Sequence, residues 1–306
     1  FFKQKTAYEI MPSLVGAEMC IRDRYTPGAN KRALEKGREV PADILILDLE
    51  DGVSPDSKNT ARDNISSILE EGGYGHREVG VRINGIGSKW HEKDVAAVSK
   101  SSANMVVVPK VETAESVENL ANLMKIKGAP PNMGIWCMIE TARGVLNVNF
   151  IAAAHPRVGA LLIGSADLTK DLRAKHVEGR MPLITSIQLC ILAARASGIT
   201  ILDSPFFDLS DDAGFLESCR QGRDMGFDGK TLLHPKTIAG ANEIFGPSEE
   251  EISWAHKIKV AHEAAVLEGK GVTLVDGQLI EALHVEEAQR LVRMAKAIKE
   301  IEEASD

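Results

Sequence analysis

Short apolar runs recur along the chain, with charged stretches of helical character between them. Eight such runs, roughly 25–35 residues apart, are rich in Val, Ile and Leu and do not alternate apolar with polar positions. Strands that are covered on both faces show this pattern. The predicted strands lie at residues 24–28, 43–50, 78–84, 105–111, 134–140, 160–167, 200–206 and 229–234.

The segments between the runs carry the residues of helix ends. Ser54 and Pro55 are typical of a helix start and predict a helix over residues 54–72. Gly128 is typical of a helix end and predicts that the helix preceding it stops there. Alternation of strand and helix eight times predicts an α/β fold, a (β/α)8 TIM barrel over residues 25–246. A doubly wound open sheet is the alternative, but no strand is followed by a Gly-x-Gly-x-x-Gly turn.

The two ends of the chain depart from this alternation. Residues 247–306 predict a helix, a hairpin that turns at Asp276-Gly277, and a last amphipathic helix, which together form an extension of the barrel. The first two dozen residues lack the apolar core of a signal peptide and resemble translated sequencing-adapter sequence. We expect residues 1–24 to be a non-native segment.

Composition narrows the function classes. The 306 residues carry a formal net charge of −8, which argues against nucleic acid as a partner. No run of 18 apolar residues occurs, so no membrane span is expected. The four cysteines show no paired spacing and predict reduced thiols of a cytoplasmic protein: Cys20, Cys137, Cys190 and Cys219.

Polar residues follow the predicted strands at their carboxyl ends, where barrel enzymes place their chemistry. Glu140 and Asp167 end neighbouring strands, and two carboxylates suit Mg²⁺, whereas no His pair has zinc-ligand spacing. A structural ion pair of Glu140 with Arg82 or Lys110 is equally compatible with its position. The polar strand ends are Asp48, Glu50, Asp51, Arg82, Asn84, Lys110, Glu112, Glu140, Asp167, Asp203 and His234.

The basic residues at these strand ends also have two interpretations each. Arg82 could clamp a substrate carboxylate or pair with the acids that end the second strand. Lys110 could form a Schiff base, but surrounding carboxylates would keep its pKa high and disfavour that role. His234, before Pro235, could line the barrel mouth or serve as a structural histidine.

Seven motifs together resemble one family. They read YTPGANKRALEK, ILDLEDGVSPDSKNTAR, VRINGIG, VPKVETAESV, MIETARGVLN, GFDGKTLLHPKTI and VDGQLIEALHVEEAQRLV. Their order and spacing over about residues 24–300 resemble the citrate lyase beta-subunit-like branch of the HpcH/HpaI aldolase superfamily. That branch includes malyl-CoA and citramalyl-CoA lyases.

The resemblance implies a TIM barrel that assembles as homotrimers or hexamers. It also implies a Mg²⁺ ion, with Mn²⁺ as the alternative metal, held by Glu140 and Asp167. It implies a carbon–carbon lyase that cleaves or forms a 3-hydroxyacyl-CoA such as malyl-CoA, methylmalyl-CoA or citramalyl-CoA, with an acyl-CoA and a 2-oxo acid as products. Cleavage of the C–C bond leaves an acyl-CoA enolate, and in this mechanism Arg82 holds the substrate and stabilises the enolate oxygen.

The remaining site residues also follow from the resemblance. Substrate-binding positions map onto Tyr25, Arg32, Lys36, Leu233 and His234. The family has an acid/base aspartate in its C-terminal extension, which completes the site of a neighbouring subunit. This chain has Glu281 there, one methylene longer.

Three other functions stay open from the sequence. A malyl-CoA thioesterase would release malate and CoA, and the Glu281 position is one place where such a switch could be made. A citrate lyase beta-type subunit would act on an acyl-carrier-protein thioester. An aldolase acting on free 2-oxo acids would not use the basic residues Arg32 and Lys36 that suit CoA phosphates.

Overall fold

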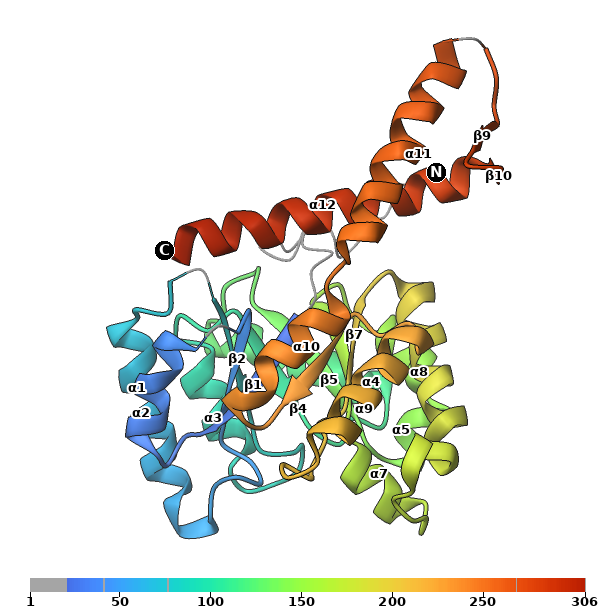
Figure 1. The fold of residues 1–306 in the computed structure, drawn as a ribbon. Helices are drawn as coiled ribbons and strands as arrows, with labels where there is room; N and C mark the ends of the chain where they lie inside the picture. The colour runs from blue at the N-terminus through green and yellow to red at the C-terminus, as the bar shows by residue number, and fades with distance from the viewer. Residues whose placement is uncertain (1–20, 41, 76, 268, 306) are drawn as a thin grey trace.

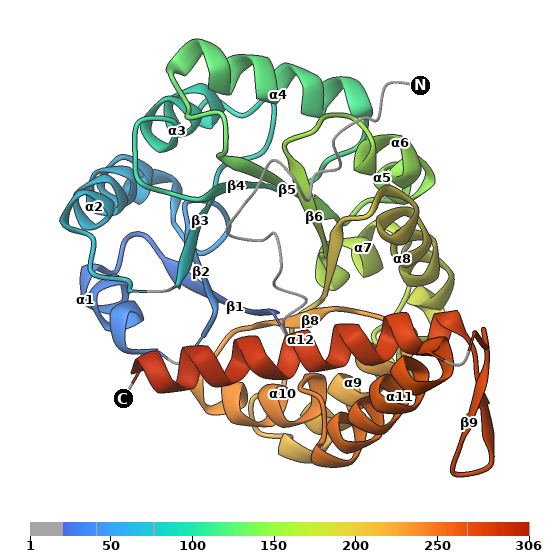
Figure 2. The same cartoon turned by 90° about the horizontal axis from the view of Figure 1, so that it is seen from above.

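A closed barrel of eight parallel strands forms the body of the protein (Figures 1 and 2). The computed structural model describes residues 21–305 apart from positions 41, 76 and 268. Each strand pairs with the next along the chain, and β8 pairs with β1, which confirms the predicted TIM barrel. The strands are β1 (Ile21–Pro27), β2 (Ile44–Asp48), β3 (Glu78–Arg82), β4 (Met105–Val108), β5 (Gly134–Ile139), β6 (Val158–Ile163), β7 (Thr200–Asp203) and β8 (Gly229–Leu232).

Helices surround the barrel on its outside (Figure 2). The Thr113 hydroxyl accepts a hydrogen bond from the Ser116 N–H at 3.2 Å and caps the start of α4. Gly128 adopts a left-handed φ of 91° and ends the helix. The helices are α1 (Lys31–Lys36), α2 (Lys58–Glu71), α3 (His91–Val98), α4 (Ala114–Lys127), α5 (Ala142–Leu146), α6 (Val148–Ala152), α7 (Ser165–Asp171), α8 (Ile184–Ser197), α9 (Asp212–Met225) and α10 (Ile238–Phe245), with 3₁₀ segments η2 (Gly37–Glu39), η3 (Pro55–Ser57), η4 (Glu178–Leu183) and η5 (Pro235–Thr237).

Alternate side chains of most strands enter two separate apolar cores. Ile46 and Trp136 belong to the core inside the barrel. Leu45 and Cys137, their neighbours in sequence, belong to the core between the strands and the helices. This division explains the runs without polar alternation, because both faces of a strand are buried.

The start of the barrel differs from the expected boundary at residue 25. Residues 21–24 of β1 pair with Gly229–Leu232 of β8 and make the whole contact that closes the ring. Of the segment predicted to be non-native, residues 1–20 lie outside the described part of the chain.

The C-terminal extension contains α11 (Glu249–Leu267), β9 (Thr273–Val275), β10 (Gln278–Ile280) and α12 (Ala282–Ser305). It has a small core of its own, built around Ile258, Ile280 and Val285. Asp276 and Gly277 both have positive φ, 48° and 84°, as the predicted two-residue hairpin turn requires.

The extension lies on the side of the barrel away from the carboxyl ends of the strands. Helix α7, which follows β6 directly, is at the bottom of Figure 1, whereas α12 crosses the top. Met294 of α12 joins the outer core, so the helix is anchored to this amino-terminal face. Among the described residues, none of the helices has the length and apolar character needed to cross a membrane.

Candidate active site

The register of β2 and β3 brings the first two charged residues of the site together. Asp48 and Arg82 are paired positions at the carboxyl ends of these strands. The Arg82 guanidinium donates through Nε and Nη2 to the two Asp48 carboxylate oxygens, both at 2.7 Å. It also lies 4.5 Å from the ring centroid of Tyr25. The predicted substrate residues Tyr25 and Arg82 are therefore in contact, and Asp48 fixes the guanidinium plane.

Glu50 joins Arg82 to Lys110. One carboxylate oxygen of Glu50 lies 3.1 Å from Arg82 Nη1, and the other accepts a hydrogen bond from Lys110 Nζ at 2.9 Å. Burial by itself lowers the pKa of Lys110, but the hydrogen bond and charge of Glu50 outweigh it and raise the pKa above its usual value. The ammonium is therefore charged, which agrees with the low expectation of a Schiff base.

Lys110 also contacts both predicted metal ligands. Its backbone N–H donates to Glu140 Oε1 at 2.9 Å, and its Nζ lies 3.3 Å from Asp167 Oδ2. Among the described residues Glu140 forms no ion pair with Arg82 or with the Lys110 ammonium, so the structural ion pair is not observed; its carboxylate instead accepts from the Lys110 backbone and lies near Asp167.

Burial dominates the electrostatics of Glu140, whose residue is 4% exposed. This burial raises the pKa of Glu140 to about 8; Lys110 opposes the shift, while Asp167 and Glu50 add to it. Such a carboxyl group binds a proton at neutral pH unless a further cation stabilises its ionised form.

Gly164 makes room for Glu140. A Cβ atom at this position, at the end of β6, would collide with Glu140 Oε2. Asp167 follows in the first turn of α7, and its side chain is 31% exposed. In the Gly-Ser-Ala-Asp sequence, which is a weak signal by itself, the glycine therefore allows the Glu140 carboxylate to lie close to the backbone. The aspartate of the same sequence supplies a second carboxylate.

The charges of this cluster favour a divalent cation. When Glu140 is ionised, the carboxylates of the cluster outnumber its cations by two. The carboxylates are Asp48, Glu50, Asp51, Glu140 and Asp167, and the cations are Arg82, Lys110 and Lys58. Hard carboxylate oxygens suit Mg²⁺, which commonly takes one or two of them and keeps waters and substrate oxygens. No group of three or more His, Cys, Asp or Glu in the described chain could hold a metal. The candidate ligands are the two carboxylates that the sequence predicted, Glu140 and Asp167.

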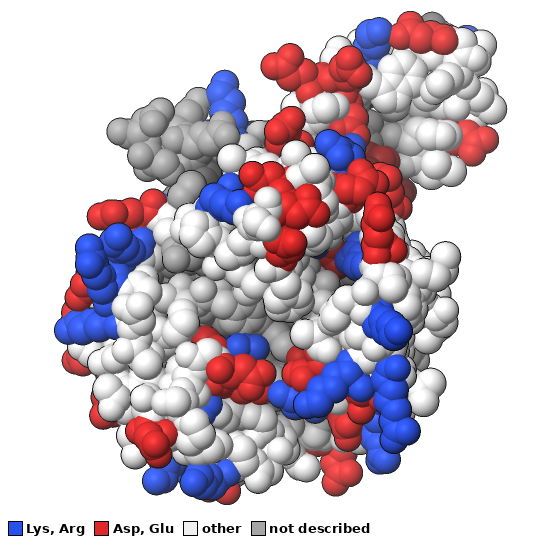
Figure 3. Space-filling model, turned by 60° about the horizontal axis from the view of Figure 1, so that its bottom comes forward, with Lys and Arg blue, Asp and Glu red and all other residues white. Residues whose placement is uncertain are grey.

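The site lies at the mouth of the barrel. Figure 3 brings the bottom of Figure 1 forward and shows acidic and basic side chains standing together beside a central hollow. All the strand ends described above open to this face.

Lys58 is a site-supporting residue that the sequence did not single out. It is buried at the start of α2, and its Nζ donates to the carbonyls of Leu49 and Glu50, both at 2.7 Å. It therefore holds the loop that carries Glu50. The only sequence feature that could have indicated this role is its position one turn after the helix-start residues Ser54 and Pro55.

The residues expected to bind the CoA part lie at the rim. Arg32 and Lys36 are exposed on the short helix α1, which follows the carboxyl end of β1. Leu233 and His234 follow β8 and are exposed. His234 caps η5, because its Nδ1 accepts a hydrogen bond from the Lys236 N–H at 3.1 Å, so it has the structural role that the sequence left open.

Two predicted polar positions are not at the mouth of this chain. Glu281 is exposed between β10 and α12, on the extension at the other face of the barrel. Asp203 was grouped with the mouth residues, and this was wrong: it is buried outside the barrel wall against Lys230 and Arg180. The cause is strand parity, since Leu202 and not Asp203 faces the barrel interior.

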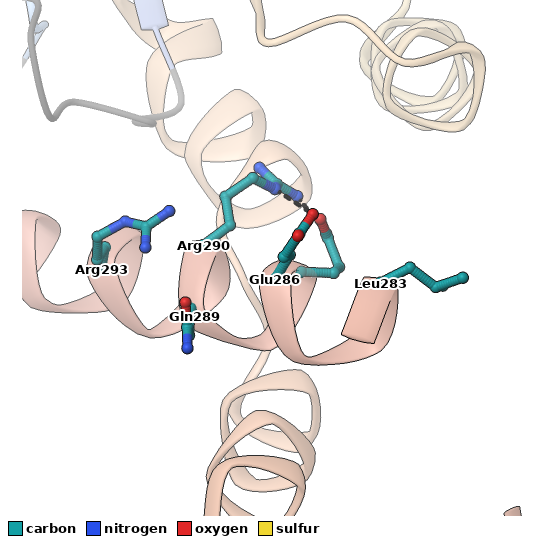
Figure 4. A pocket seen from close by; sticks show the side chains of 6 residues that line it. Leu283, Glu286, Gln289, Arg290 and Arg293 are labelled. Carbon is teal, nitrogen blue, oxygen red and sulfur yellow. Dashed lines mark hydrogen bonds and ion pairs between the residues drawn. The ribbon is translucent and has the colours of Figure 1, made fainter. Parts of the chain in front are cut away.

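A second hollow, of about 430 Å³, lies along α12 (Figure 4). Within it Arg290 pairs with Glu287 at 2.6 Å. None of the predicted site residues lines it. The lining residues are Leu283, Glu286, Glu287, Gln289, Arg290 and Arg293.

The relatives of this chain among known proteins have two different activities, thioester hydrolysis and C–C cleavage. A (3S)-malyl-CoA thioesterase from Cereibacter sphaeroides is 43% identical over 274 residues, which cover 90% of this chain and 94% of the relative. An L-malyl-CoA/beta-methylmalyl-CoA lyase from the same species is 32% identical over 298 residues, with the same coverage of 90% and 94%.

The expectation of a carbon–carbon lyase is therefore wrong. Thioesterases at 42–43% identity resemble this chain more than lyases at 32% do, so the thioesterase alternative fits better. The motifs quoted for the resemblance are general to the family, and they do not distinguish C–C cleavage from thioester hydrolysis.

The fold and the family are shared with solved structures. Protein CitE from Mycobacterium tuberculosis, in complex with magnesium, acetoacetate and coenzyme A, superposes with a TM-score of 0.74 and 27% identity. The match covers 91% of this chain and 98% of CitE. The model of the HpcH/HpaI aldolase/citrate lyase family matches residues 24–235. The chain belongs to the HpcH/HpaI aldolase/citrate lyase family.

Proposed function

We propose that this protein is a Mg²⁺-dependent thioesterase that hydrolyses malyl-CoA, or a similar CoA thioester of a short hydroxy acid, to the free acid and CoA. The observation that carries the proposal is the higher identity to (3S)-malyl-CoA thioesterases than to the lyases of the family. The carboxylate and guanidinium cluster at the barrel mouth supplies groups for an anionic substrate.

Glu140 and Asp167 would hold the metal. The excess of carboxylates in the cluster and the raised pKa of Glu140 both favour a bound cation there. When bound, Mg²⁺ supplies Lewis-acid polarisation of substrate oxygens. CitE, a family member at 27% identity, has been solved with magnesium.

Arg82 would stabilise negative charge on the substrate. Two of the five N–H groups of the guanidinium donate to Asp48, and Nη1 lies 3.1 Å from Glu50, so N–H groups are left over for a ligand. Water attack on the thioester carbonyl places negative charge on its oxygen before the C–S bond breaks and the CoA thiolate leaves. A fixed, charged donor beside that oxygen lowers the barrier.

Glu281 would act as the general base that takes the proton of the attacking water, in the site of a neighbouring copy. Within its own chain it lies on the extension, at the face opposite the mouth. Leu279 and Leu283, on either side of it, are 52% and 60% exposed, as expected of a segment that packs against another chain. We propose a homotrimer or hexamer on this ground.

The rim residues Arg32 and Lys36 would bind the phosphates of CoA. Both are exposed on α1 and have no described acidic partner, so they are available to an anion. The free thiols Cys137, Cys190 and Cys219 are buried and suit the reducing cytoplasm that we propose as the location.

Product analysis tests the proposal. Incubation of the protein with (3S)-malyl-CoA and Mg²⁺ should yield malate and one free CoA thiol for each substrate consumed. Glu140→Ala and Asp167→Ala should remove this activity, as should EDTA, while the far-ultraviolet circular dichroism stays unchanged. Formation of glyoxylate and acetyl-CoA, without free CoA, would reject hydrolysis.

A further inference from the structure

Lys110 is the one residue of the described site that touches both proposed metal ligands. Its backbone N–H holds Glu140 at 2.9 Å and its ammonium lies 3.3 Å from Asp167. The same ammonium lies 2.9 Å from Glu50 and 3.9 Å from Asp51. Three carboxylates therefore surround a single permanent cation.

The backbone of Lys110 is unusual for a lysine. Its φ is 54°, in the left-handed region where glycine is favoured and other residues are strained. This conformation aims the N–H at Glu140, and a glycine would provide the same hydrogen bond without the strain. A lysine therefore occupies this position in spite of a conformational cost, which points to a role for the ammonium.

The ammonium and a metal ion at Asp167 are two cations beside one carboxylate. Each weakens the attraction of Asp167 for the other, because like charges a few ångström apart repel in a partly buried site. An arriving carboxylate of the substrate would give Lys110 a new partner and remove this opposition.

We propose that Lys110 couples metal binding to substrate binding: it opposes the metal at Asp167, and the substrate's carboxylate relieves the opposition by taking the ammonium as its partner. This inference rests on the proposed function, since it takes Glu140 and Asp167 as the metal ligands. Reciprocity of linkage requires that the metal tightens binding of the carboxylate by the same factor. Lys110 is in this sense a positioning residue that makes metal and carboxylate bind cooperatively.

The test measures metal affinity directly. Mg²⁺ is titrated calorimetrically into the full-length protein, alone and with saturating malate, for the unmodified protein, Lys110→Met and Lys110→Gly. Without malate, both variants should bind Mg²⁺ more tightly, by about tenfold, within the usual range of such couplings. Malate should tighten Mg²⁺ binding by about tenfold in the unmodified protein and much less in the variants.

Two controls separate charge from other effects. Lys125→Met removes the same charge from the exposed surface at the end of α4 and should leave Mg²⁺ affinity unchanged. Titration at pH about 9, above the pKa of about 8 for Glu140, keeps a proton on that group from competing with the metal.

Each outcome gives a decision. Equal or weaker Mg²⁺ binding by Lys110→Met and Lys110→Gly overturns the coupling role while leaving the metal site in place. Equal enhancement by malate in all proteins also overturns it. If Asp167→Ala binds Mg²⁺ as tightly as the unmodified protein, the metal site itself is misplaced, and both proposals fail.

Discussion

At the scale of single residues, burial decides how the carboxylates of the site behave. Asp48 and Glu140 end apolar strands in the same way in the sequence. Asp48 accepts two hydrogen bonds from the charged Arg82 guanidinium, whereas Glu140 accepts one from the backbone N–H of Lys110. The less compensated group has its pKa raised to about 8, which makes it the one most dependent on an added cation.

Mg²⁺ affinity should therefore depend on pH. Below about 8 the raised pKa keeps Glu140 protonated, and the metal must displace that proton, so affinity should fall by nearly tenfold per pH unit. Above about 8 it should level off. Calorimetry in buffers of different ionisation enthalpy should find close to one proton released at pH about 6 and almost none at pH about 9. A pH-independent affinity over that range would contradict the assignment, and Glu140→Gln serves as the control that has no proton to release.

At the scale of elements, strand register and parity select which charged residues meet. Asp203 of β7 and Lys230 of β8 are paired positions, and their parity directs both outward, where Arg180 of η4 joins them. Lys230 is 1% exposed and its Nζ lies 2.7 Å from Asp203. This network ties the last two strands to the loop before α8.

Removing Lys230 should destabilise the protein. Lys230→Met leaves the buried Asp203 carboxylate short of one partner and should lower the free energy of unfolding by about 3 kcal/mol. The exposed pair of Lys257 and Asp276 has the same 2.7 Å separation, and Lys257→Met should cost no more than about 0.5 kcal/mol. Urea unfolding of both variants makes the comparison. Equal losses would show that burial is not the deciding factor.

At the scale of the whole molecule, the barrel mouth and the extension lie on opposite faces. Helix α12 crosses the amino-terminal face, as Figures 1 and 2 show. Glu281 directly precedes this helix in the chain. One chain therefore presents the proposed metal ligands and Arg82 at its mouth but keeps its proposed base away from them. An assembly in which extensions reach neighbouring mouths would bring the two sets together.

Mixing two inactive variants tests this arrangement. Glu281→Gln should lower the rate of thioester hydrolysis by about 10²-fold or more, because a general base contributes that much. Asp167→Ala should be inactive through loss of the metal. After unfolding and refolding together, mixed oligomers should recover part of the activity, since an intact mouth can meet an intact extension. No recovery, with mixed oligomers demonstrated by mass, would show that each chain works alone.

The amino-acid sequence by itself determined the barrel, the hairpin extension and the residues at the strand ends. Runs of buried strand, capping residues such as Thr113 and Gly128, and the Asp276-Gly277 turn act locally, so they can be read without knowing the fold. It also placed Glu140 and Asp167 after neighbouring strands, because chain order in a barrel is also spatial order. The predicted strand over 160–167 was too long, since β6 ends at Ile163 and Asp167 lies in the first turn of α7.

Tertiary structure alone decided which of these residues meet. The sequence could not show that Asp203 faces outward, that Lys58 is buried, or that Lys110 reaches Glu140 with its backbone and Asp167 with its side chain. Strand parity, loop conformation and a left-handed backbone angle set those contacts, and each depends on segments distant in the chain. Apolar periodicity fixes the order of the strands, whereas the charges at their ends find partners only when the barrel has closed.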